Sequence, residues 1–473
     1  MSEEKNDLRK IREEKLDRFT EQGVVPYPKN FKGRIANKLA LTKDKGEQIK
    51  VAGRLMSKRV MGKSTFAHLQ DATAKIQVYF RIDKLKDGRY EFFKDIDIGD
   101  FIGVEGQLFE TRTGEKTVLA KRFKFLAKSL RPLPEKWNKL KDKETRYRRR
   151  YLDILVNKES SNILKSRSQL LSSIRETLNS KGFIEVETPI LQKNAGGAAA
   201  QPFKTHHNTF DRDLFLRIAP ELFLKRLIVG GWDRVFEIGR NFRNEGISTR
   251  HNPEFTMMEV YSAYSDYNYM MELAKDIVIN AAGTLKSMGI KSEVDCISGD
   301  WEKKNIWELL EEYTGKSFSP EDEPETFKKK SKELEIPPGK DSTAKIVDRI
   351  FSKYVEPQLI KPTFVTGYLS EDSPLAKKSN KNPLLAERFE LFIAGQEIGN
   401  AYSEQNDPRI QKEMFKQQVA SEGGQVDQDY IEALEYGMPP AAGLGIGIDR
   451  LTMLLTGKKS IREVILFPML KNR

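Results

Sequence analysis

Apolar and polar residues alternate in short runs between residues 47 and 127, which is the pattern of strands with one buried face. The runs are IKVAGRLMSKRV, TFAHLQD, KIQVYFRI and DFIGVEGQLFETRTGEKTVLAKRFKFLAK. Turns that contain Gly or Asp separate them. About five strands of this length predict a small closed barrel.

We interpret residues 47–127 as a five-stranded barrel of the OB type, flanked by two segments of different pattern. Residues 1–46 start with Leu8, Ile11, Leu16 and Phe19 near helical spacing, which predicts a short charged amphipathic helix. Such a helix either packs on the next domain, the reading we favour, or acts as a binding arm. Residues 128–150 contain two prolines and dense charge without alternation, so we predict a linker that runs into a helix.

From residue 151 to 473, helical and strand patterns are mixed. SQLLSSIRETLNSKGF and YNYMMELAKDIVINAAGTL are typical of helices, whereas LFLRIA, RVFEIGRNFRNE, EFTMMEVYSAY and AAGLGIGI are typical of strands. The mixture predicts an α+β domain built on an antiparallel sheet flanked by helices.

Composition narrows the function classes. Lys and Arg number 81 against 69 Asp and Glu, a net charge of +12, which favours a polyanionic partner but also occurs in proteins that bind no nucleic acid. The single cysteine, Cys296, and four histidines exclude an internal disulfide and a Cys/His zinc site and suit a reducing compartment. No apolar run of about 18 residues and no secretory h-region occurs, so we expect a cytoplasmic protein without membrane spans.

Residues 242–259, FRNEGISTRHNPEFTMME, bring both signs of charge together. Two strands around the loop GISTRHNP would place Arg243 and Glu245 on one face. The second strand would place on one face Phe255, Met257, Glu259 and Tyr261. A guanidinium binds phosphate or carboxylate, a phenyl ring can stack on a base, and carboxylates hold a cation. The hairpin therefore suits a nucleotide plus an amine, with an exposed hairpin of compensating charges as the alternative.

The segment AAGLGIGIDRL predicts a strand of small residues, through which a ligand or backbone can approach, followed by a helix that ends at Gly457. Its glycine spacing does not match a dinucleotide fingerprint, because Ile448 stands where Gly or Ala is required. Arg450 lies in the first turn of the helix, where the dipole disfavours a cation. We therefore expect an anionic ligand there, with a surface salt bridge as the alternative.

Carboxylates recur at intervals of seven in AERFELFIAGQEIGNAYSEQND, at Glu390, Glu397 and Glu404. Beside a phosphate-binding surface, carboxylates of this density suit Mg²⁺ ions that bridge protein and triphosphate oxygens. Acidic segments alone do not establish such a site.

Three segments, in order, resemble the three motifs of the class II aminoacyl-tRNA synthetases: IRETLNSKGFIEVETPIL, FRNEGISTRHNPEFTMMEVY and GLGIGIDRL. GGAAAQPFKTHHN, LRIAPELFLKRLIVGGWDRVFEIGRNFRNEG and FELFIAGQEIGNAYSEQNDP are similar to the lysyl-tRNA synthetases, so that the resemblance spans nearly the whole chain. It implies a homodimeric, bacterial-like enzyme that activates L-lysine with ATP to lysyl-adenylate and transfers lysyl to tRNA(Lys). It also implies that the barrel reads the anticodon.

The resemblance further implies roles for single residues. Toward ATP, it places Arg243 at the α-phosphate and the substrate carboxylate, Glu245 and Phe255 at the adenine, His251 and Arg450 toward the γ-phosphate, Asn252 beside them, and Mg²⁺ on Glu390 and Glu397. Toward lysine, it places Gly197 and Glu221 near the α-amino group, Glu259, Tyr261 and Glu404 at the ε-ammonium, and Asn400 and Tyr402 beside the substrate. The family more often has Phe where Tyr402 stands.

On the barrel, Phe66 and His68 on one strand and Gln77 on the next offer stacking surfaces and an amide to exposed bases. Arg59 adds a phosphate or base contact, and Glu115 lies at a loop position that the family uses for a uridine. The alternative is that Phe66 belongs to the barrel core.

Three other functions remain open. An aspartyl- or asparaginyl-specific relative would need a cationic pocket where Glu259 and Glu404 stand. A paralogue that attaches lysine-type groups to an elongation factor resembles only the catalytic domain and would lack the barrel. A non-catalytic nucleic-acid-binding protein would not be expected to retain Arg243, Arg450 and both predicted magnesium carboxylates.

Overall fold

The structure is a computed structural model that describes residues 3–85, 87–134, 140, 142–194, 196–197, 200–290, 297, 299–339, 341–422 and 426–471. Cys296 and residues 135–139 and 141 of the predicted linker lie outside these ranges. The chain forms two compact units, Met1–Lys139 and Leu140–Arg473. Within the described ranges, no helix is long and apolar enough to cross a membrane.

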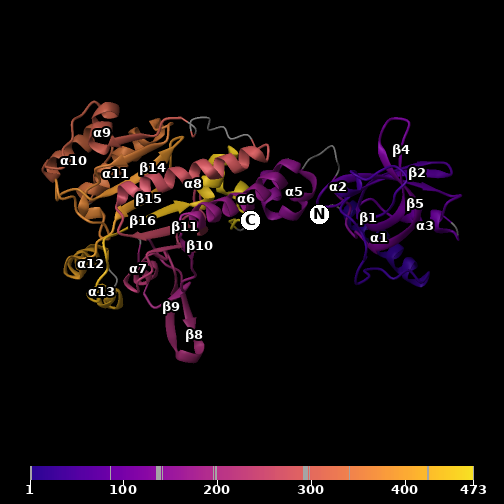
Figure 1. Cartoon of the computed structure of the whole chain (residues 1–473), viewed down its shortest axis with the longest axis horizontal. Helices are drawn as coiled ribbons and strands as arrows, with labels where there is room; N and C mark the ends of the chain where they lie inside the picture. The colour runs from indigo at the N-terminus through magenta and orange to yellow at the C-terminus, as the bar shows by residue number, and fades with distance from the viewer. Residues whose placement is uncertain are drawn as a thin grey trace. The chain divides into compact units, whose positions relative to one another are not determined.

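The first unit contains a closed five-stranded barrel with the strand order β1-β2-β3-β5-β4 (Figure 1). Its strands are β1 (Gln48–Met61), β2 (Ser64–Gln70), β3 (Lys75–Arg81), β4 (Phe101–Glu110) and β5 (Lys116–Ala127). Alternate residues of β2 and β3, such as Leu69 and Val78, are fully buried, so the apolar alternation in the sequence becomes the barrel interior. The predicted barrel is confirmed.

The N-terminal segment packs on this barrel. Helix α1 (Glu3–Glu21) inserts Phe19, which is fully buried and meets Phe92 and Phe125 edge-on, with ring centroids 4.8 and 5.5 Å apart. The short helices α2 (Asn37–Ala40) and α3 (Arg89–Asp95) contribute to the same core. Residues 1–46 and the barrel therefore share one hydrophobic core, which favours a packing role for the helix.

The second unit is built on an eight-stranded sheet with the order β12-β13-β14-β15-β16-β11-β10-β6. Its strands are β6 (Ile184–Glu185), β10 (Arg234–Phe242), β11 (Glu254–Ala263), β12 (Glu302–Asn305), β13 (Thr363–Thr366), β14 (Arg388–Ile393), β15 (Gln396–Ser403) and β16 (Ala441–Gly447). The strands from β13 to β10 are antiparallel, as predicted, whereas β12 and β6 pair in parallel at the two edges.

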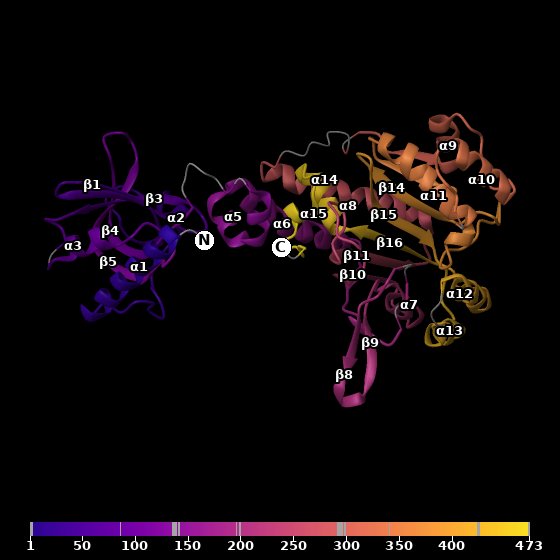
Figure 2. The same cartoon turned by 180° about the vertical axis from the view of Figure 1, so that it is seen from behind.

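Helices α6 (Lys158–Ser180) and α8 (Tyr267–Ser287) pack against the sheet and form the main core with it (Figures 1 and 2). Asp266 caps the N-terminus of helix α8, and its side chain accepts hydrogen bonds from two backbone N–H groups of the first turn. Its buried residues recur at helical spacing and include Met270, Ile277 and Ala281. The two helices contain most of the two stretches for which the sequence predicts helix.

The remaining elements surround this sheet. The helices are α4 (Lys143–Arg148), α5 (Arg150–Val156), α7 (Glu221–Val229), α9 (Ile306–Thr314), α10 (Pro324–Glu333), α11 (Thr343–Tyr354), α12 (Pro408–Glu422), α13 (Gln428–Glu435), α14 (Ile448–Thr456) and α15 (Ile461–Val464). A small sheet of β7 (Leu191–Gln192), β9 (Arg212–Leu216) and β8 (Lys204–His207) carries a hairpin that extends away from the large sheet (Figures 1 and 2). Helices α9, α10 and α11 share a separate apolar cluster that includes Leu310, Phe327 and Ile350.

Candidate active site

A cavity of about 1180 Å³ lies over the central strands of the second unit. Most of the residues that the sequence predicts for substrate binding line it. They are Gly197, Glu221, Arg243, Glu245, His251, Asn252, Phe255, Glu259, Tyr261, Glu397, Asn400, Tyr402 and Arg450. Two predicted residues, Glu390 and Glu404, do not line it. The cavity has the size of a small-molecule site.

The predicted hairpin forms, with β10 and β11 paired in antiparallel register. Along β11, the predicted common face is confirmed, because Phe255, Met257, Glu259 and Tyr261 all line the cavity. The predicted strand through Glu245 is wrong at its end, since β10 stops at Phe242. Beyond it the backbone curls, and the Glu245 N–H donates to the Arg243 carbonyl (2.8 Å). The loop, and not the strand period, brings these two side chains to the cavity.

One end of the cavity is cationic. The Nε of Arg243 is buried and has no hydrogen-bond partner among the described residues, and its guanidinium carbon lies 5.2 Å from the centroid of the Phe255 ring. Burial lowers the pKa of Arg243, so this cation is stabilised by any anion that enters the cavity. Arg450 Nη1 donates to Glu397 Oε2 (2.8 Å), and Arg450 Nη2 lies 3.3 Å from His251 Nε2.

The carboxylate next to Arg450 in the sequence holds its helix in place. Asp449 accepts a hydrogen bond from the Thr256 N–H (2.8 Å) and pairs with Arg167 (2.5 Å). It thereby ties α14 to β11 and α6. The predicted strand and helix of this segment are confirmed, and α14 ends before Gly457, whose φ is +64°.

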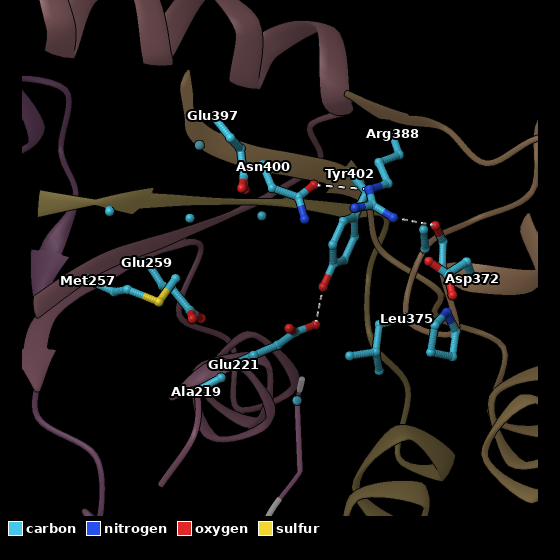
Figure 3. A pocket seen from close by; sticks show the side chains of 18 of the residues that line it. Ala219, Glu221, Met257, Glu259, Asp372, Leu375, Arg388, Glu397, Asn400 and Tyr402 are labelled. Carbon is cyan, nitrogen blue, oxygen red and sulfur yellow. Dashed lines mark hydrogen bonds between the residues drawn. The ribbon is translucent and has the colours of Figure 1, made fainter. Parts of the chain in front are cut away.

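The other end of the cavity is anionic. Glu221 accepts a bond from Tyr402 Oη (2.5 Å), and Glu259 accepts one from Tyr261 Oη (3.0 Å). Figure 3 shows Glu221 and Glu259 approaching the same part of the cavity, with the Tyr402 ring above Glu221. Burial, with Glu221 nearby, raises the pKa of Glu259 to about 8. A buried carboxylate pair of this kind favours a cationic ligand.

Glu404 lies behind this wall, and its carboxylate pairs with Lys225. A Cβ at Gly443 would collide with Glu404 Oε1 and with the Tyr261 ring. Glycine at 443 is therefore required for the close approach of these side chains to β16. From the sequence we expected a ligand or another backbone segment to approach these glycines. At Gly443 the groups that approach are instead the side chains of Glu404 and Tyr261.

The predicted nucleic-acid residues share the outer face of the barrel in the first unit. Arg59 lies opposite Phe66, and His68 lies opposite Gln77, across neighbouring strands. His68 Nε2 and Gln77 Nε2 both contact the Glu115 carboxylate, at 3.1 and 2.7 Å. The structure thus brings the five predicted residues together on one surface.

Phe66 is half-buried and lies outside the barrel core, so the alternative that it is a core residue is wrong. Its ring stacks on Tyr79, with centroids 4.3 Å apart and planes inclined by 19°. We did not predict Tyr79, although the alternation in KIQVYFRI places it on the same face as Gln77. Two stacked rings on an outer barrel face form a platform on which an unpaired base can stack.

Comparison with known proteins identifies the family. Residues 142–471 match the family model described as tRNA synthetases class II (D, K and N), and residues 49–126 match that of the OB-fold nucleic acid binding domain. The chain is 50% identical to a lysine–tRNA ligase of Pelotomaculum thermopropionicum, over 100% of this chain and 96% of the relative. The chain belongs to the lysyl-tRNA synthetase family.

Two further relatives of the family extend this similarity over their whole length. A lysine–tRNA ligase of Carboxydothermus hydrogenoformans is 50% identical over 100% of this chain and 99% of its own. One of Staphylococcus aureus is 46% identical over 100% of both chains. The similarity therefore covers the barrel and the catalytic unit together.

Of the two carboxylates predicted to bind magnesium, only one lines the cavity. Glu397 lines the cavity, where its carboxylate pairs with Arg450. Glu390 is bound away from it by Arg388 Nη2 (2.5 Å) and Tyr368 Oη (3.0 Å), and burial raises the pKa of Glu390 to about 7. Within the described ranges, no group of three His, Cys, Asp or Glu side chains is placed to hold a metal ion. Because Mg²⁺ usually takes one or two carboxylates plus phosphate oxygens, Glu397 fits such a site.

Two cations that contact predicted site residues, Arg388 and Lys225, were not predicted. Arg388 contacts both Glu390 and Asn400, and it stands two residues before Glu390 in the sequence, on the same side of β14. Lys225 contacts Glu221 and Glu404, and its i,i+4 spacing from Glu221 on α7 is the one signal that could have revealed it.

Proposed function

We propose that the protein is a lysine–tRNA ligase. It activates L-lysine with ATP to lysyl-adenylate and pyrophosphate, and then transfers lysyl to the 3′ end of tRNA(Lys). The observation that carries this proposal is the opposite charge of the two ends of one cavity. Arg243 and Arg450 suit a triphosphate and a carboxylate, and Glu221 and Glu259 suit the ammonium groups of lysine.

The first step needs no nucleophile from the protein. The lysine carboxylate attacks the α-phosphorus of ATP in line and expels pyrophosphate, so that catalysis consists of positioning and charge neutralisation. Arg243, whose buried Nε has no hydrogen-bond partner in the described part of the chain, is the group that we assign to the α-phosphate and the lysine carboxylate. The 3′-hydroxyl of the terminal tRNA adenosine then attacks the adenylate carbonyl and releases AMP.

The nucleotide is assigned to the loop between β10 and β11 and to α14. Phe255 and Glu245 receive the adenine, His251 and Arg450 point toward the γ-phosphate, and Asn252 borders the pocket. All five line the cavity. When bound, Mg²⁺ would supply positive charge that neutralises the triphosphate. Glu397 would hold it, joined by Glu390 once that carboxylate leaves Arg388.

The amino acid is assigned to the anionic end. Glu221 and Gly197 receive the α-amino group, and Asn400 and Tyr402 flank the stem. We assign the ε-ammonium to Glu259, Tyr261 and Glu404, of which the first two line the cavity. An aspartate-specific enzyme would need cations at these positions, which argues against that alternative.

The barrel face around Phe66 is the proposed anticodon site. Its stacked rings, the Arg59 guanidinium and the amide of Gln77 suit unpaired bases and the backbone that joins them. We further propose that the enzyme acts in the cytoplasm as a homodimer. In support of the dimer, apolar side chains of the first motif and of the β8–β9 hairpin are exposed: Ile184, Ile190, Leu191 and Phe210.

Lysine-dependent exchange of pyrophosphate into ATP tests the proposal. We expect exchange with L-lysine, little with ornithine or arginine, none with aspartate, and loss of activity when a chelator removes Mg²⁺. Arginine should be rejected because its planar fork needs a wider pocket than an ammonium. Preferential activation of aspartate would overturn the assignment.

A further inference from the structure

Lys225 is a buried cation behind the anionic end of the cavity. Its side chain on α7 is fully buried, and its Nζ lies 2.5 Å from Glu221 Oε1 and pairs with Glu404. The same ammonium lies 5.4 Å from the centroid of the Tyr402 ring. Lys225 itself does not line the cavity. It therefore contacts the walls of the site without facing the ligand.

The contacts of Lys225 join two subsites. Glu221 is the carboxylate that we assign to the α-amino group, and Glu404 is one that we assign to the ε-ammonium. Lys225 contacts one oxygen of each, and Tyr402 Oη donates to the same Glu221 oxygen at 2.5 Å. Both carboxylates are thus oriented by bonds from inside the protein.

The charge of the ionised pocket matches the two ammonium groups of lysine only if Lys225 is counted. Three carboxylates, Glu221, Glu259 and Glu404, are buried within this end of the site. The one ammonium of Lys225 leaves two negative charges when all three are ionised. Free lysine brings two ammonium groups, and its carboxylate is assigned to Arg243 at the other end.

We infer that Lys225 is a positioning and specificity-determining residue, the internal counter-ion that leaves two unpaired negative charges for the two ammonium groups of lysine. This inference rests on the proposed function. Burial already raises the pKa of Glu259 to about 8 with Lys225 present. Without Lys225, three carboxylates would crowd one desolvated space, and they would hold one more proton than in the wild type. The subsite that holds the protonated carboxyl would then bind an ammonium poorly.

A purely structural ion pair is the competing explanation. A buried pair is often no more stabilising than apolar residues of the same volume, so stability alone does not explain an ammonium at this position. The groups around Lys225 come from several elements. They are Glu221 on α7, Tyr402 on β15 with Glu404 directly after it, Glu259 and Tyr261 on β11, and Tyr430 on α13. Of the two carboxylates that it contacts, Glu221 lines the cavity and Glu404 lies behind the cavity wall, and both are buried.

The test is Lys225→Met, which keeps the length of the stem and removes the charge. In pyrophosphate exchange, we expect the KM for lysine to rise roughly 10- to 100-fold at about pH 7, while the KM for ATP stays within about twofold. The rise should shrink as the pH approaches about 9, because the extra proton on the carboxylates is then lost. The wild-type protein should show a smaller change over the same interval.

Lys128→Met is the matched control. Lys128 is also fully buried and pairs with two carboxylates, Asp97 (2.5 Å) and Asp100 (2.8 Å), but it belongs to the barrel unit. Replacing it removes a buried, paired ammonium and so should lower the stability of the fold in a comparable way. We expect lysine activation without tRNA to keep its KM and its pH profile in this variant.

Lys225→Gln, which keeps a hydrogen-bond donor without a charge, is the second variant. The inference is overturned if folded Lys225→Met binds lysine as the wild type does, or if its KM rises equally at every pH. It is also overturned if both Lys225 variants fail to fold while Lys128→Met folds, because Lys225 would then serve folding. A wild-type protein that does not activate lysine would instead overturn the proposed function.

Discussion

Replacing Arg243 by Ala tests the cationic end of the cavity most directly. The guanidinium is half-buried, its Nε has no partner within the described part of the chain, and its nearest aromatic contact is Phe255 at 5.2 Å. Among the residues that the structure describes, its removal breaks no ion pair. We therefore expect Arg243→Ala to fold normally and to lose adenylate formation.

The size of the loss follows from the charge that develops on the α-phosphate. Two unit charges about 4 Å apart interact by about 4 kcal/mol at an effective dielectric constant near 20. Loss of one such preorganised group lowers rates by about 10²- to 10³-fold, or about 2.7–4 kcal/mol. Arg243→Lys should recover only part of this, because an ammonium cannot bind two oxygens as a planar fork does.

Pyrophosphate exchange with saturating lysine measures this step without tRNA, and thermal unfolding measures the fold. Arg240→Ala is the matched control, since Arg240 stands on β10 and is exposed, and within the described ranges its side chain pairs only with Glu254 (3.6 Å). It should exchange at a near-normal rate. Near-normal exchange by Arg243→Ala would refute the assignment, and a collapse of its unfolding temperature would show that Arg243 holds the fold.

Three further predictions concern the barrel and the anionic end. Phe66→Ala should weaken use of tRNA by about 1–3 kcal/mol and leave lysine activation intact; joint loss of both activities and of thermal stability would contradict a surface role. Glu404→Gln should weaken lysine binding by about 2–5 kcal/mol, seen as a higher KM for lysine, and leave ATP binding nearly unchanged. A change in the KM for ATP alone would refute the assignment of Glu404 to lysine. Because burial raises the pKa of Glu259 to about 8, this carboxyl is mostly protonated near pH 7 and ionises above it, so the KM for lysine should fall as the pH rises through that value. Glu259→Gln should abolish this fall, and a pH profile identical to that of the wild type would show that another group titrates.

The sequence by itself determined the barrel strands, several strands and helices of the second unit, and the face of β11 that lines the cavity. Strand alternation placed Phe255, Met257, Glu259 and Tyr261 on one face, and all four line the cavity, because a side-chain period of two holds wherever a strand is regular. The same rule predicted the barrel, whereas only the structure decided that Phe66 lies outside its core. It failed at Glu245, because β10 ends at Phe242 and a loop has no period to extrapolate.

The tertiary structure alone decided which charges face the ligand. Glu390 and Glu404 have the same spacing pattern as Glu397, yet Arg388 and Lys225 bind them away from the cavity. Lys225 and Glu404 are 179 residues apart in the sequence, so no local pattern relates them. They meet because α7 packs beside the sheet where β15 ends. Whether a charged side chain faces the ligand or is neutralised depends on the groups that pack against it. Packing between segments that are distant in the sequence cannot be read from a local pattern of residues.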